Sequence, residues 1–233
     1  MKSIEFVKDK SSIKYYLLAM VCVFCVYFAK IIELFSPLFK KVYYGYLVDV
    51  FVNSFSLVLW IILFLVMFFI CKKFDIKIFT SVPKADRKEL SLKRLILLYV
   101  LAILPMLFVS IYLNFTLKIV YDLGNRVTIL GLLSNLTNMA SWAARIIFIV
   151  LFINFIHLGF EKNIKFKNEK LNKYFPFGAI FSFLIFGIID LFVLKITLPY
   201  FYLFLSFYYG VIYLVSDRKF ASTYLICYLI WLL

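Results

Sequence analysis

The sequence predicts an all-α fold: a polytopic bundle of about six or seven transmembrane helices with a cytoplasmic N-terminus. Hydrophobic residues make up 65% of the 233 residues and charged residues only 16%, against about 45–50% and about 25% in soluble proteins. Glycine and proline number only 7 and 5, so the apolar excess is neither collagen-like nor low-complexity. A chain this short cannot hide so much apolar surface inside itself, which leaves the bilayer as the solvent for most of it.

Seven apolar runs account for that bundle. A helix that crosses a bilayer needs about 20 apolar residues, and the first six runs reach or approach this length. The last run has 14 residues, or about 21 Å of helix, so the sequence leaves open whether it spans. The first run is too long for a signal peptide and lacks a small-residue cleavage site, so we expect it to remain as an anchor. The runs cover residues 13–39, 46–71, 95–117, 138–160, 176–194, 199–215 and 220–233.

The basic residues predict the orientation of these runs. If the N-terminus is cytoplasmic and every run spans, four segments lie inside, namely 1–14, 72–94, 161–175 and 216–219. They hold 19 lysines and arginines, whereas the outside segments hold five. Short cytoplasmic loops of membrane proteins carry such an excess. The sequence therefore predicts one integral membrane domain over 1–233, with N-terminal helices over 1–125 and a second helical core over about 130–233.

The net charge of +14 first suggests binding to nucleic acid. A nucleic-acid surface would interleave its basic residues with base-stacking aromatics on a soluble face, but here the aromatics lie inside the apolar runs. The basic loops are better explained by orientation and by contact with anionic lipid headgroups. We expect the lipid bilayer as a partner and no nucleic acid. Lysine outnumbers arginine 21 to 5, as in AT-rich bacterial genomes, which predicts a bacterial cytoplasmic membrane.

Catalytic, metal-binding and cofactor-binding patterns are missing from the sequence. Cys22 and Cys25 form a C-x-x-C motif inside an apolar run, where thiols behave as small hydrophobic groups. The only histidine, His157, cannot form a histidine-rich metal site, and its place at the cytoplasmic end of the fourth run favours a structural role. No P-loop and no G-x-G-x-x-G motif occurs. The sequence thus predicts no catalytic set, no metal and no cofactor.

Arg145 and Asp190 are the strongest candidate functional residues. Arg145 lies in the fourth run and Asp190 near the middle of the fifth, where an unpaired charge costs at least about 2.5–3.5 kcal/mol. Consecutive helices are antiparallel neighbours, so we expect these two side chains to form a buried pair. Asn138, Ser141 and Asn154 are the polar residues expected to accompany them.

A second polar set lies near the outer membrane surface. Lys30 and Glu33 are three residues apart on the first helix, so they share a face and can pair. A lysine near a helix end can also extend its ammonium group to the interface. Asp49 opens the second run near the same surface and could join them. A locally neutralised pair is the simpler interpretation, and a transport site is the alternative.

From Asn138 to the C-terminus, the order of features resembles the CPBP family of bacterial membrane proteins, the CAAX-protease and bacteriocin-processing group. Its first motif, two Glu, three variable residues and Arg, falls on residues 140–145, where Arg145 is present and both Glu are absent. Its second motif, Phe, three variable residues and His, falls on Phe186 to Asp190, with Asp in place of His. A helix with Gly210, a charged turn at 216–219 and a short last helix follow.

The last helix of that family carries a His and an Asn, and here Cys227 and Trp231 stand roughly at those positions. The resemblance implies that the groups which activate water for peptide cleavage are gone. Arginine stays protonated and cannot replace them as a base, and a carboxylate stabilised beside an arginine is a poor substitute for an imidazole. The resemblance therefore implies a pseudo-protease.

These observations favour a non-catalytic bacterial membrane protein that serves as scaffold, regulator or immunity partner of another membrane or cell-envelope protein. The alternative is a small transport component, a substrate-binding membrane subunit whose cavity would be lined by charged residues within the membrane. An active intramembrane protease with unusual catalytic residues is a third reading. The charged residues of the proposed cavity are Lys30, Glu33, Asp49, Arg145 and Asp190.

Overall fold

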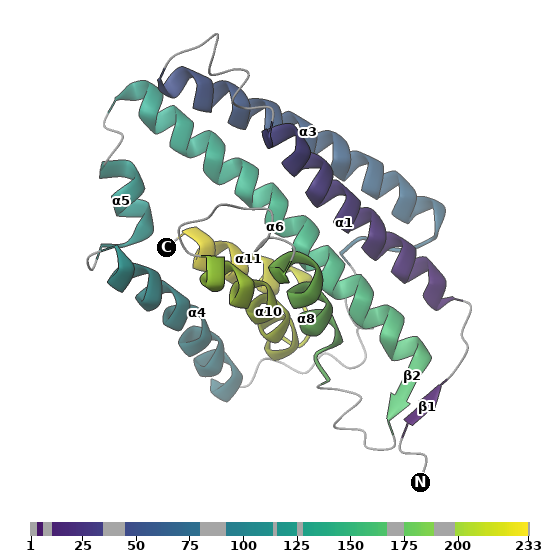
Figure 1. The fold of residues 1–233 in the computed structure, drawn as a ribbon. Helices are drawn as coiled ribbons and strands as arrows, with labels where there is room; N and C mark the ends of the chain where they lie inside the picture. Colours follow the sequence, from purple (N-terminus) through teal and green to yellow (C-terminus); the bar gives the residue numbers. More distant parts are fainter. Residues whose placement is uncertain are drawn as a thin grey trace.

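A computed structural model describes residues 4–6, 11–34, 45–79, 92–113, 116–124, 128–166, 175–188 and 199–232. Helices account for most of these residues, and two three-residue strands accompany them (Figure 1). The helices are α1 (Ser12–Leu34), α3 (Tyr46–Lys73), α4 (Leu92–Tyr112), α5 (Lys118–Gly124), α6 (Ile129–Asn163), α8 (Phe177–Ser182), the π-helix η2 (Phe183–Ile188), α10 (Pro199–Val215) and α11 (Phe220–Leu232). The strands are β1 (Ile4–Phe6) and β2 (Ile164–Phe166).

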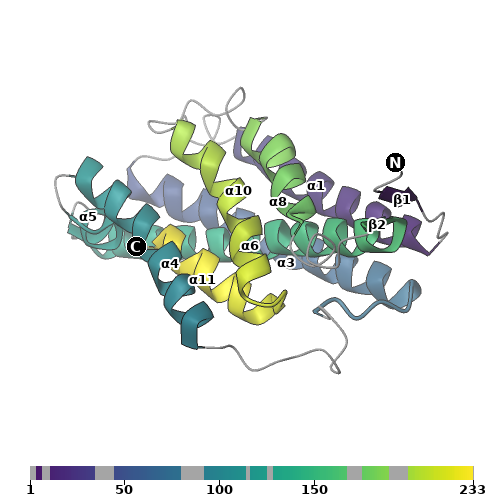
Figure 2. The ribbon, with the colours of Figure 1, turned by 90° about the horizontal axis from the view of Figure 1, so that it is seen from below.

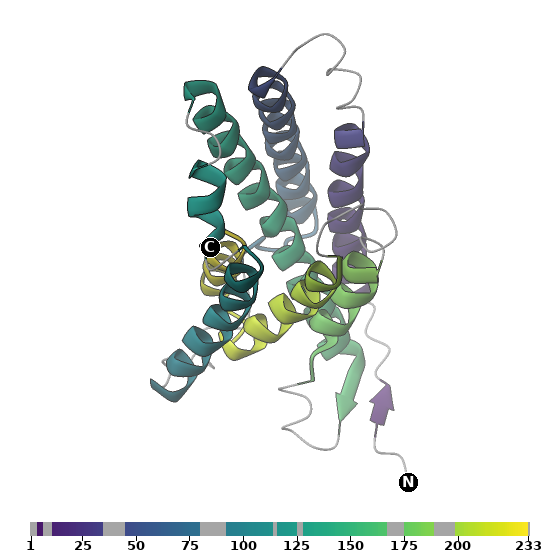
Figure 3. The same ribbon diagram turned by 60° about the vertical axis from the view of Figure 1, so that its left-hand side comes forward.

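Helix α6 is the centre of the fold. It has 35 residues, or about 52 Å of length. Helices α1 and α3 run along it on one side, and α8, α10 and α11 pack against it on another (Figures 1 and 3). Viewed from below, α10 crosses α6 steeply, while α1 and α3 follow its direction (Figure 2). Helices from both halves of the chain therefore share one core.

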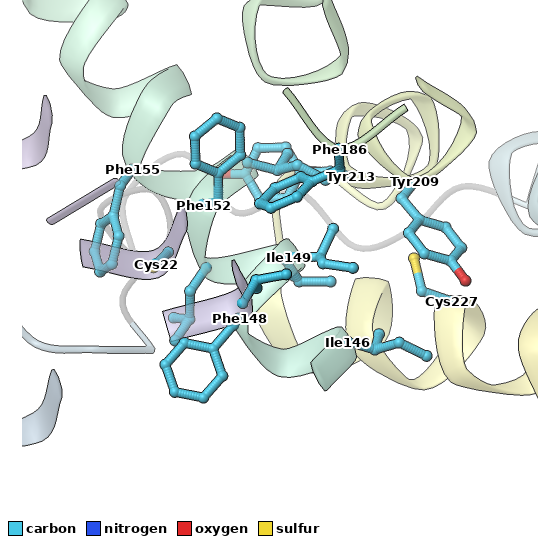
Figure 4. Close-up of a cluster of buried hydrophobic side chains, with 14 of the residues drawn as sticks. Cys22, Ile146, Phe148, Ile149, Phe152, Phe155, Phe186, Tyr209, Tyr213 and Cys227 are labelled. Carbon is cyan, nitrogen blue, oxygen red and sulfur yellow. The ribbon is translucent and has the colours of Figure 1, made fainter. Parts of the chain in front are cut away.

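Aromatic side chains fill that core. Phe148, Phe152 and Phe155 of α6 are all fully buried. Figure 4 shows Phe152 lying together with Phe186 of η2 and Tyr213 of α10, and the rings of Phe152 and Phe186 meet edge to face with centroids 5.0 Å apart. Edge-to-face pairs add stability beyond the area that they bury. The core thus holds α6, η2 and α10 at a defined register.

Among the residues that the structure describes, three helices are long and apolar enough to cross a membrane, namely α1, α3 and α6. The other apolar helices of the described residues are shorter, and they cover Ile96–Ile111, Phe177–Ile188, Phe204–Val215 and Phe220–Leu232. The predicted runs at 46–71 and 199–215 match α3 and α10 closely. These helix lengths account for fewer spans than the six or seven predicted, so that number stays a prediction.

Helix α6 begins nine residues before the predicted fourth run, at Ile129 rather than at residue 138. The segment between them contains Ser134, Asn135 and Thr137, which an apolar count leaves outside a span. Thr128 caps the helix, because its hydroxyl accepts a 3.1 Å hydrogen bond from the backbone amide of Gly131. The capped helix therefore starts before the predicted run, and these polar residues lie within it.

The fifth predicted run, 176–194, is not one regular helix. It begins as α8 and continues as η2 up to Ile188, and residues 189–198 lie outside the described part of the chain. A π-helix displaces the regular backbone pairing, and the Tyr27 hydroxyl donates a 2.6 Å hydrogen bond to the carbonyl of Ile185 in η2. Helix α1 thus supplies a hydrogen-bond donor to a backbone carbonyl of the π-helix η2.

Three short elements were not predicted from the sequence. Helix α5 forms between the third and fourth runs, and β1 pairs antiparallel with β2, with Glu5 opposite Lys165. The strands come from the first residues of the chain and from the segment directly after α6. Their pairing joins two segments that the charge distribution had placed on the same side of the membrane, and apart from this short ladder the described residues form the predicted all-helical fold.

Candidate functional site

The first half of α6 buries its polar side chains and exposes its apolar ones, the reverse of a helix in a soluble protein. Its buried side includes Ser134, Asn135 and Arg145, whereas the outward side carries apolar residues. Ile129 is 85% exposed. A helix in water would turn its leucines inward and its polar groups outward. Without water outside, polar groups gain by meeting other helices, so this pattern suits a helix surrounded by lipid. The exposed apolar residues are Ile129, Leu130, Leu132, Leu133 and Leu136.

The buried polar side of α6 meets α3 and α5. The hydroxyls of Ser141 and Ser56 lie 3.0 Å apart, and both side chains are buried. Asn135 donates a 2.8 Å hydrogen bond to the backbone carbonyl of Asp122 in α5. Asn138 is half-buried and lies three residues before Ser141, on the same face of the helix. Ser141, a predicted site residue, therefore joins two helices.

Arg145 lies against aromatic rings. It is 6% exposed, and its Cζ atom is 4.3 Å from the ring centroid of Trp142. Trp142 stacks on Trp231 of α11 with centroids 5.1 Å apart, and Lys118 Nζ lies 4.3 Å from the Trp231 centroid. Such cation–π contacts strengthen when they are desolvated. The expected partner, Asp190, lies outside the described residues, so the Arg145–Asp190 pair stays a prediction.

The secondary polar set is only partly placed. Lys30 is buried, and its Nζ lies 5.2 Å from the ring centroid of Tyr27. Asp49 is half-buried in the first turn of α3, where a carboxylate interacts favourably with the helix dipole. The side chain of Glu33 lies outside the described part of the structure. The predicted Lys30–Glu33 pair therefore stays a prediction.

Asn154 belongs to a different polar group from Arg145. It lies nine residues further along α6, which is about 13 Å along the axis and about half a turn around it. There its Oδ1 accepts a 2.5 Å hydrogen bond from the hydroxyl of Tyr213 in α10. The structure thus separates the predicted cluster into an Arg145 part and an Asn154 part.

His157 lies beside Asn154 and Tyr213 and is fully buried. Its ring centroid is 5.7 Å from that of Tyr213 and 6.4 Å from that of Phe177. Its Nε2 atom lies 3.5 Å from Oε1 of Glu161, too far for a good hydrogen bond. Within the described part of the chain, neither imidazole nitrogen has a hydrogen-bond partner. Leaving buried polar atoms without a hydrogen bond is costly, and among the described residues His157 has two such atoms.

Glu161 connects this group to the turn between α10 and α11, residues 216–219. Arg218 in that turn forms an ion pair with Glu161, and its neighbour Asp217 forms one with Arg94 of α4. Both turn residues have positive φ angles, 52° for Asp217 and 59° for Arg218, which are unfavourable for residues other than glycine. The ion pairs therefore hold a strained turn against α4 and α6.

We name Asn154, His157, Glu161, Tyr213 and Arg218 the α6–α10 polar cluster. Sequence reasoning predicted only Asn154 of this cluster as a site residue. The spacing of His157 and Glu161, four residues apart on one helix face, was the signal that could have found a second contact. No local signal marks Arg218, because it reaches Glu161 from 57 residues away.

The cluster contains an imidazole and a carboxylate, which can exchange protons. It does not resemble a metal site, since among the described residues no group of three or more His, Cys, Asp or Glu side chains could hold an ion. No protein-family model matches the chain, and comparisons with curated proteins and with solved structures found no match. The assignment of function therefore rests on the residues and contacts of this chain.

Proposed function

We propose that this chain is a non-catalytic integral membrane protein of the bacterial cytoplasmic membrane that binds another membrane or cell-envelope protein as scaffold, regulator or immunity partner. The observation that carries the proposal is the way α6 uses its polar side chains. Ser141 bonds to Ser56 of α3. Asn154 accepts a bond from Tyr213 of α10, and Arg145 lies on a tryptophan ring. Ser141 and Asn154 thus join α6 to other helices, and Arg145 packs on Trp142, which stacks on Trp231 of α11, so these groups are engaged within the bundle.

The kinship with the CPBP family is part of the proposal. In that family's first motif, the two Glu would stand at Ala140 and Ser141. Ser141 is buried and contacts the hydroxyl of Ser56. A catalytic carboxylate at that position must reach a water molecule, whereas this serine contacts a neighbouring helix. The contact supports a pseudo-protease in which the old catalytic position serves helix packing.

The proposal also includes a cytoplasmic N-terminus. Four contacts link segments that the charge distribution assigns to the cytoplasm. Strand β1 pairs with β2, and Lys162 donates a hydrogen bond to Ser11. Arg94 pairs with Asp217 in the α10–α11 turn. Arg218 of the same turn pairs with α6. Segments that touch must lie on the same side of the bilayer, so these contacts support the proposed arrangement.

Six or seven helices would then enter the membrane. Besides the three long helices, α4 has 21 residues and α10 has 17, which correspond to about 31 Å and about 25 Å. The hydrocarbon core is about 30 Å thick, so α4 matches it and α10 nearly does. Helix α11, with 13 residues, reaches only about 20 Å. In this arrangement α11 ends inside the bundle, stacked on α6 through Trp231.

The outward faces of α3 and α4 provide the surface for lipid and for a partner. Phe51, Phe55 and Val58 of α3 are exposed, as are Leu104 and Phe108 of α4. Large apolar side chains suit contact with lipid or with a partner's helix, and helices associate within a membrane through close packing rather than through a hydrophobic driving force. The proposal therefore places the partner's helix beside α3 or α4, within the bilayer.

An intramembrane hydrolase is the second candidate function. One observation favours it: His157 and Glu161 are 3.5 Å apart at the end of α6, which is the arrangement of a base and the group that orients it. Against it, Phe177 and Tyr213 pack on the imidazole. The two candidates differ in whether His157 supports chemistry.

A cleavage assay separates these functions. The purified chain in lipid nanodiscs is incubated with membrane and envelope proteins from the same cells, and new peptide ends are counted by mass spectrometry. We expect no cleavage above that of a His157→Gln variant, with Lys162→Gln as the control from the same end of α6. Cleavage that His157→Gln abolishes and Lys162→Gln preserves contradicts the proposal and identifies a hydrolase.

Binding is tested separately. The chain is purified in mild detergent from its own membranes, and the co-purifying proteins are then expressed alone and reconstituted with it. We expect one membrane or envelope protein to bind in near-equal amount, and photo-crosslinkers at Phe55 or Leu104 to reach it. A chain that reconstitutes with none of these proteins contradicts the proposal. Crosslinkers that capture lipid alone contradict the placement beside α3 or α4.

A further inference from the structure

One carboxylate oxygen in the α6–α10 polar cluster faces two nitrogen groups. Oε1 of Glu161 forms the ion pair with Nη1 of Arg218, and the same oxygen lies 3.5 Å from Nε2 of His157. Arginine is always charged, whereas histidine changes its charge between about pH 5 and pH 8. One oxygen therefore lies between a permanent cation and a conditional one.

The turn that carries Arg218 is held under strain. Asp217 and Arg218 both adopt the left-handed backbone region, which side chains other than glycine rarely occupy and which persists only where surrounding contacts enforce it. Backbone hydrogen bonds at the end of α10 hold part of the turn, among them the 2.9 Å bond from the Arg218 amide to the carbonyl of Tyr213. The ion pairs to Arg94 and Glu161 and the 2.6 Å hydrogen bond between the hydroxyls of Ser216 and Thr223 add to them. Loss of one ion pair removes part of what opposes the strain.

We propose that His157 is a proton-binding site that controls this turn: a proton on the imidazole displaces Arg218 from Glu161 and opens the α10–α11 turn. With neutral His157, the carboxylate pairs with Arg218 alone. A protonated imidazole carries a hydrogen on both nitrogens and a full positive charge, and its Nε2 faces the oxygen that Arg218 uses. Two positive charges then converge on one carboxylate, and they repel each other strongly in a poorly solvated site. Arg218 sits on the turn, so it moves outward.

His157 is enclosed by few other ionisable groups. Helix α8 contributes Phe177 and has no titratable residue, and α10 contributes Tyr213. Helix α1 places Tyr16 against the neighbouring positions Gly159 and Phe160, and Lys162 lies near Tyr15. Among the described residues, the charged groups that contact the site itself are Glu161 and Arg218. Glu161 has a side chain 30% exposed, which gives protons a route from the aqueous side.

The direction of the effect follows from linkage. A proton that opens the turn binds more tightly to the open form, so the closed turn is favoured at higher pH and the open turn at lower pH. His157 is the only histidine in the chain, so removing it should remove the response between pH 5.5 and pH 8. We call this proton-controlled contact of His157, Glu161 and Arg218 at the α10–α11 turn the latch. It would operate whether or not the protein binds a second membrane protein.

Hydrogen exchange of the full chain in lipid nanodiscs tests the latch. Amide exchange of the α10–α11 turn is measured at about pH 5.5 and at about pH 8 and corrected for the intrinsic pH dependence of exchange. We expect the wild-type turn to lose about tenfold in protection at the lower pH, which corresponds to about 1.4 kcal/mol. His157→Gln should show no such change, Arg218→Gln should be unprotected at both values, and the control Lys162→Gln should behave as wild type.

Two outcomes overturn the latch: equal protection of the wild-type turn at both pH values, or a pH response that survives in His157→Gln. If His157→Gln does not fold, the wild-type chain labelled with ¹³C-histidine carries one imidazole signal, because there is one histidine. That signal should titrate between about pH 5.5 and about pH 8 and shift its midpoint in Arg218→Gln. A signal that does not titrate, or that has the same midpoint in both proteins, overturns the latch as well.

Discussion

The hydroxyl of Tyr213 donates a 2.5 Å hydrogen bond to Oδ1 of Asn154, and both side chains are buried. The two residues are 59 positions apart, so this bond fastens α10 to the centre of α6. The Asn154 amide nitrogen has no partner among the described residues, so the bond from Tyr213 to Oδ1 satisfies only the acceptor half of this side chain. A bond of this kind fixes the register of two helices as well as their proximity.

Tyr213→Phe should destabilise the protein by about 1–3 kcal/mol, because it leaves the buried amide of Asn154 without its bond. The measurement is the free energy of unfolding in detergent micelles. Tyr224→Phe is the matched control, since Tyr224 is only half-buried and contributes stacked ring contacts that phenylalanine keeps. If both variants lost the same free energy of unfolding, the Tyr213 hydrogen bond would contribute no more to stability than the Tyr224 hydroxyl does.

Asn154→Leu combined with Tyr213→Phe provides the double-mutant comparison. Once Tyr213 has lost its hydroxyl, replacing Asn154 removes an unsatisfied amide rather than a bonded one. The double variant should therefore be less destabilised than the sum of the single variants, by about 0.5–3 kcal/mol. Additive losses would mean that the two side chains do not interact in the folded protein.

Gly210→Ala should destabilise the protein by about 1–3 kcal/mol through overpacking. A Cβ atom at Gly210 would fall on the backbone Cα of Ala179 in α8, and backbone atoms cannot rotate away as a flexible side chain can. Gly124→Ala in α5 is the control, because a Cβ there meets nothing within 4 Å. That control should be neutral or slightly stabilising. Thermal unfolding of both variants would distinguish these results.

Arg218→Gly and Arg218→Ala both remove the ion pair with Glu161, but they treat the backbone differently. Arg218 has a φ of 59°, which glycine adopts freely and alanine does not. Arg218→Gly should therefore be the more stable of the two by about 1 kcal/mol. Chemical unfolding of both variants measures this difference. A more stable alanine variant would indicate that the turn is not strained at this position.

Labelling with a membrane-impermeant maleimide tests the proposed orientation. The four native cysteines are buried, so new exposed cysteines should give the signal. Lys77→Cys follows α3 on the proposed cytoplasmic side, and Gly124→Cys ends α5 on the proposed outer side; both positions are exposed. In intact cells Gly124→Cys should be labelled and Lys77→Cys should not, and both should be labelled after lysis. The reverse pattern contradicts a cytoplasmic N-terminus.

The candidate site could be predicted only in part. Arg145 and Ser141 stand out because a polar residue in an apolar run is costly, and both are buried as part of helix contacts. Which polar residues meet could not be predicted from cost alone. Asn154 was grouped with Arg145, yet it bonds to Tyr213, because the helix turns through about half a revolution between the two positions.

The sequence by itself determined that this protein is helical and that it has helices long and apolar enough for a membrane. Those properties follow from local quantities, namely the length and the hydrophobicity of each run. It also predicted the sidedness of the loops from their charge.

Only the tertiary structure decided that other helices pack around α6 and that the buried polar face of its first half meets α3 and α5. It also decided that Glu161 contacts both His157 and Arg218. These contacts join residues from separate helices, and they depend on the rotation and register at which the helices pack. That rotation and register are settled by the aromatic core around Phe152 and Phe186. No local pattern in the chain encodes them.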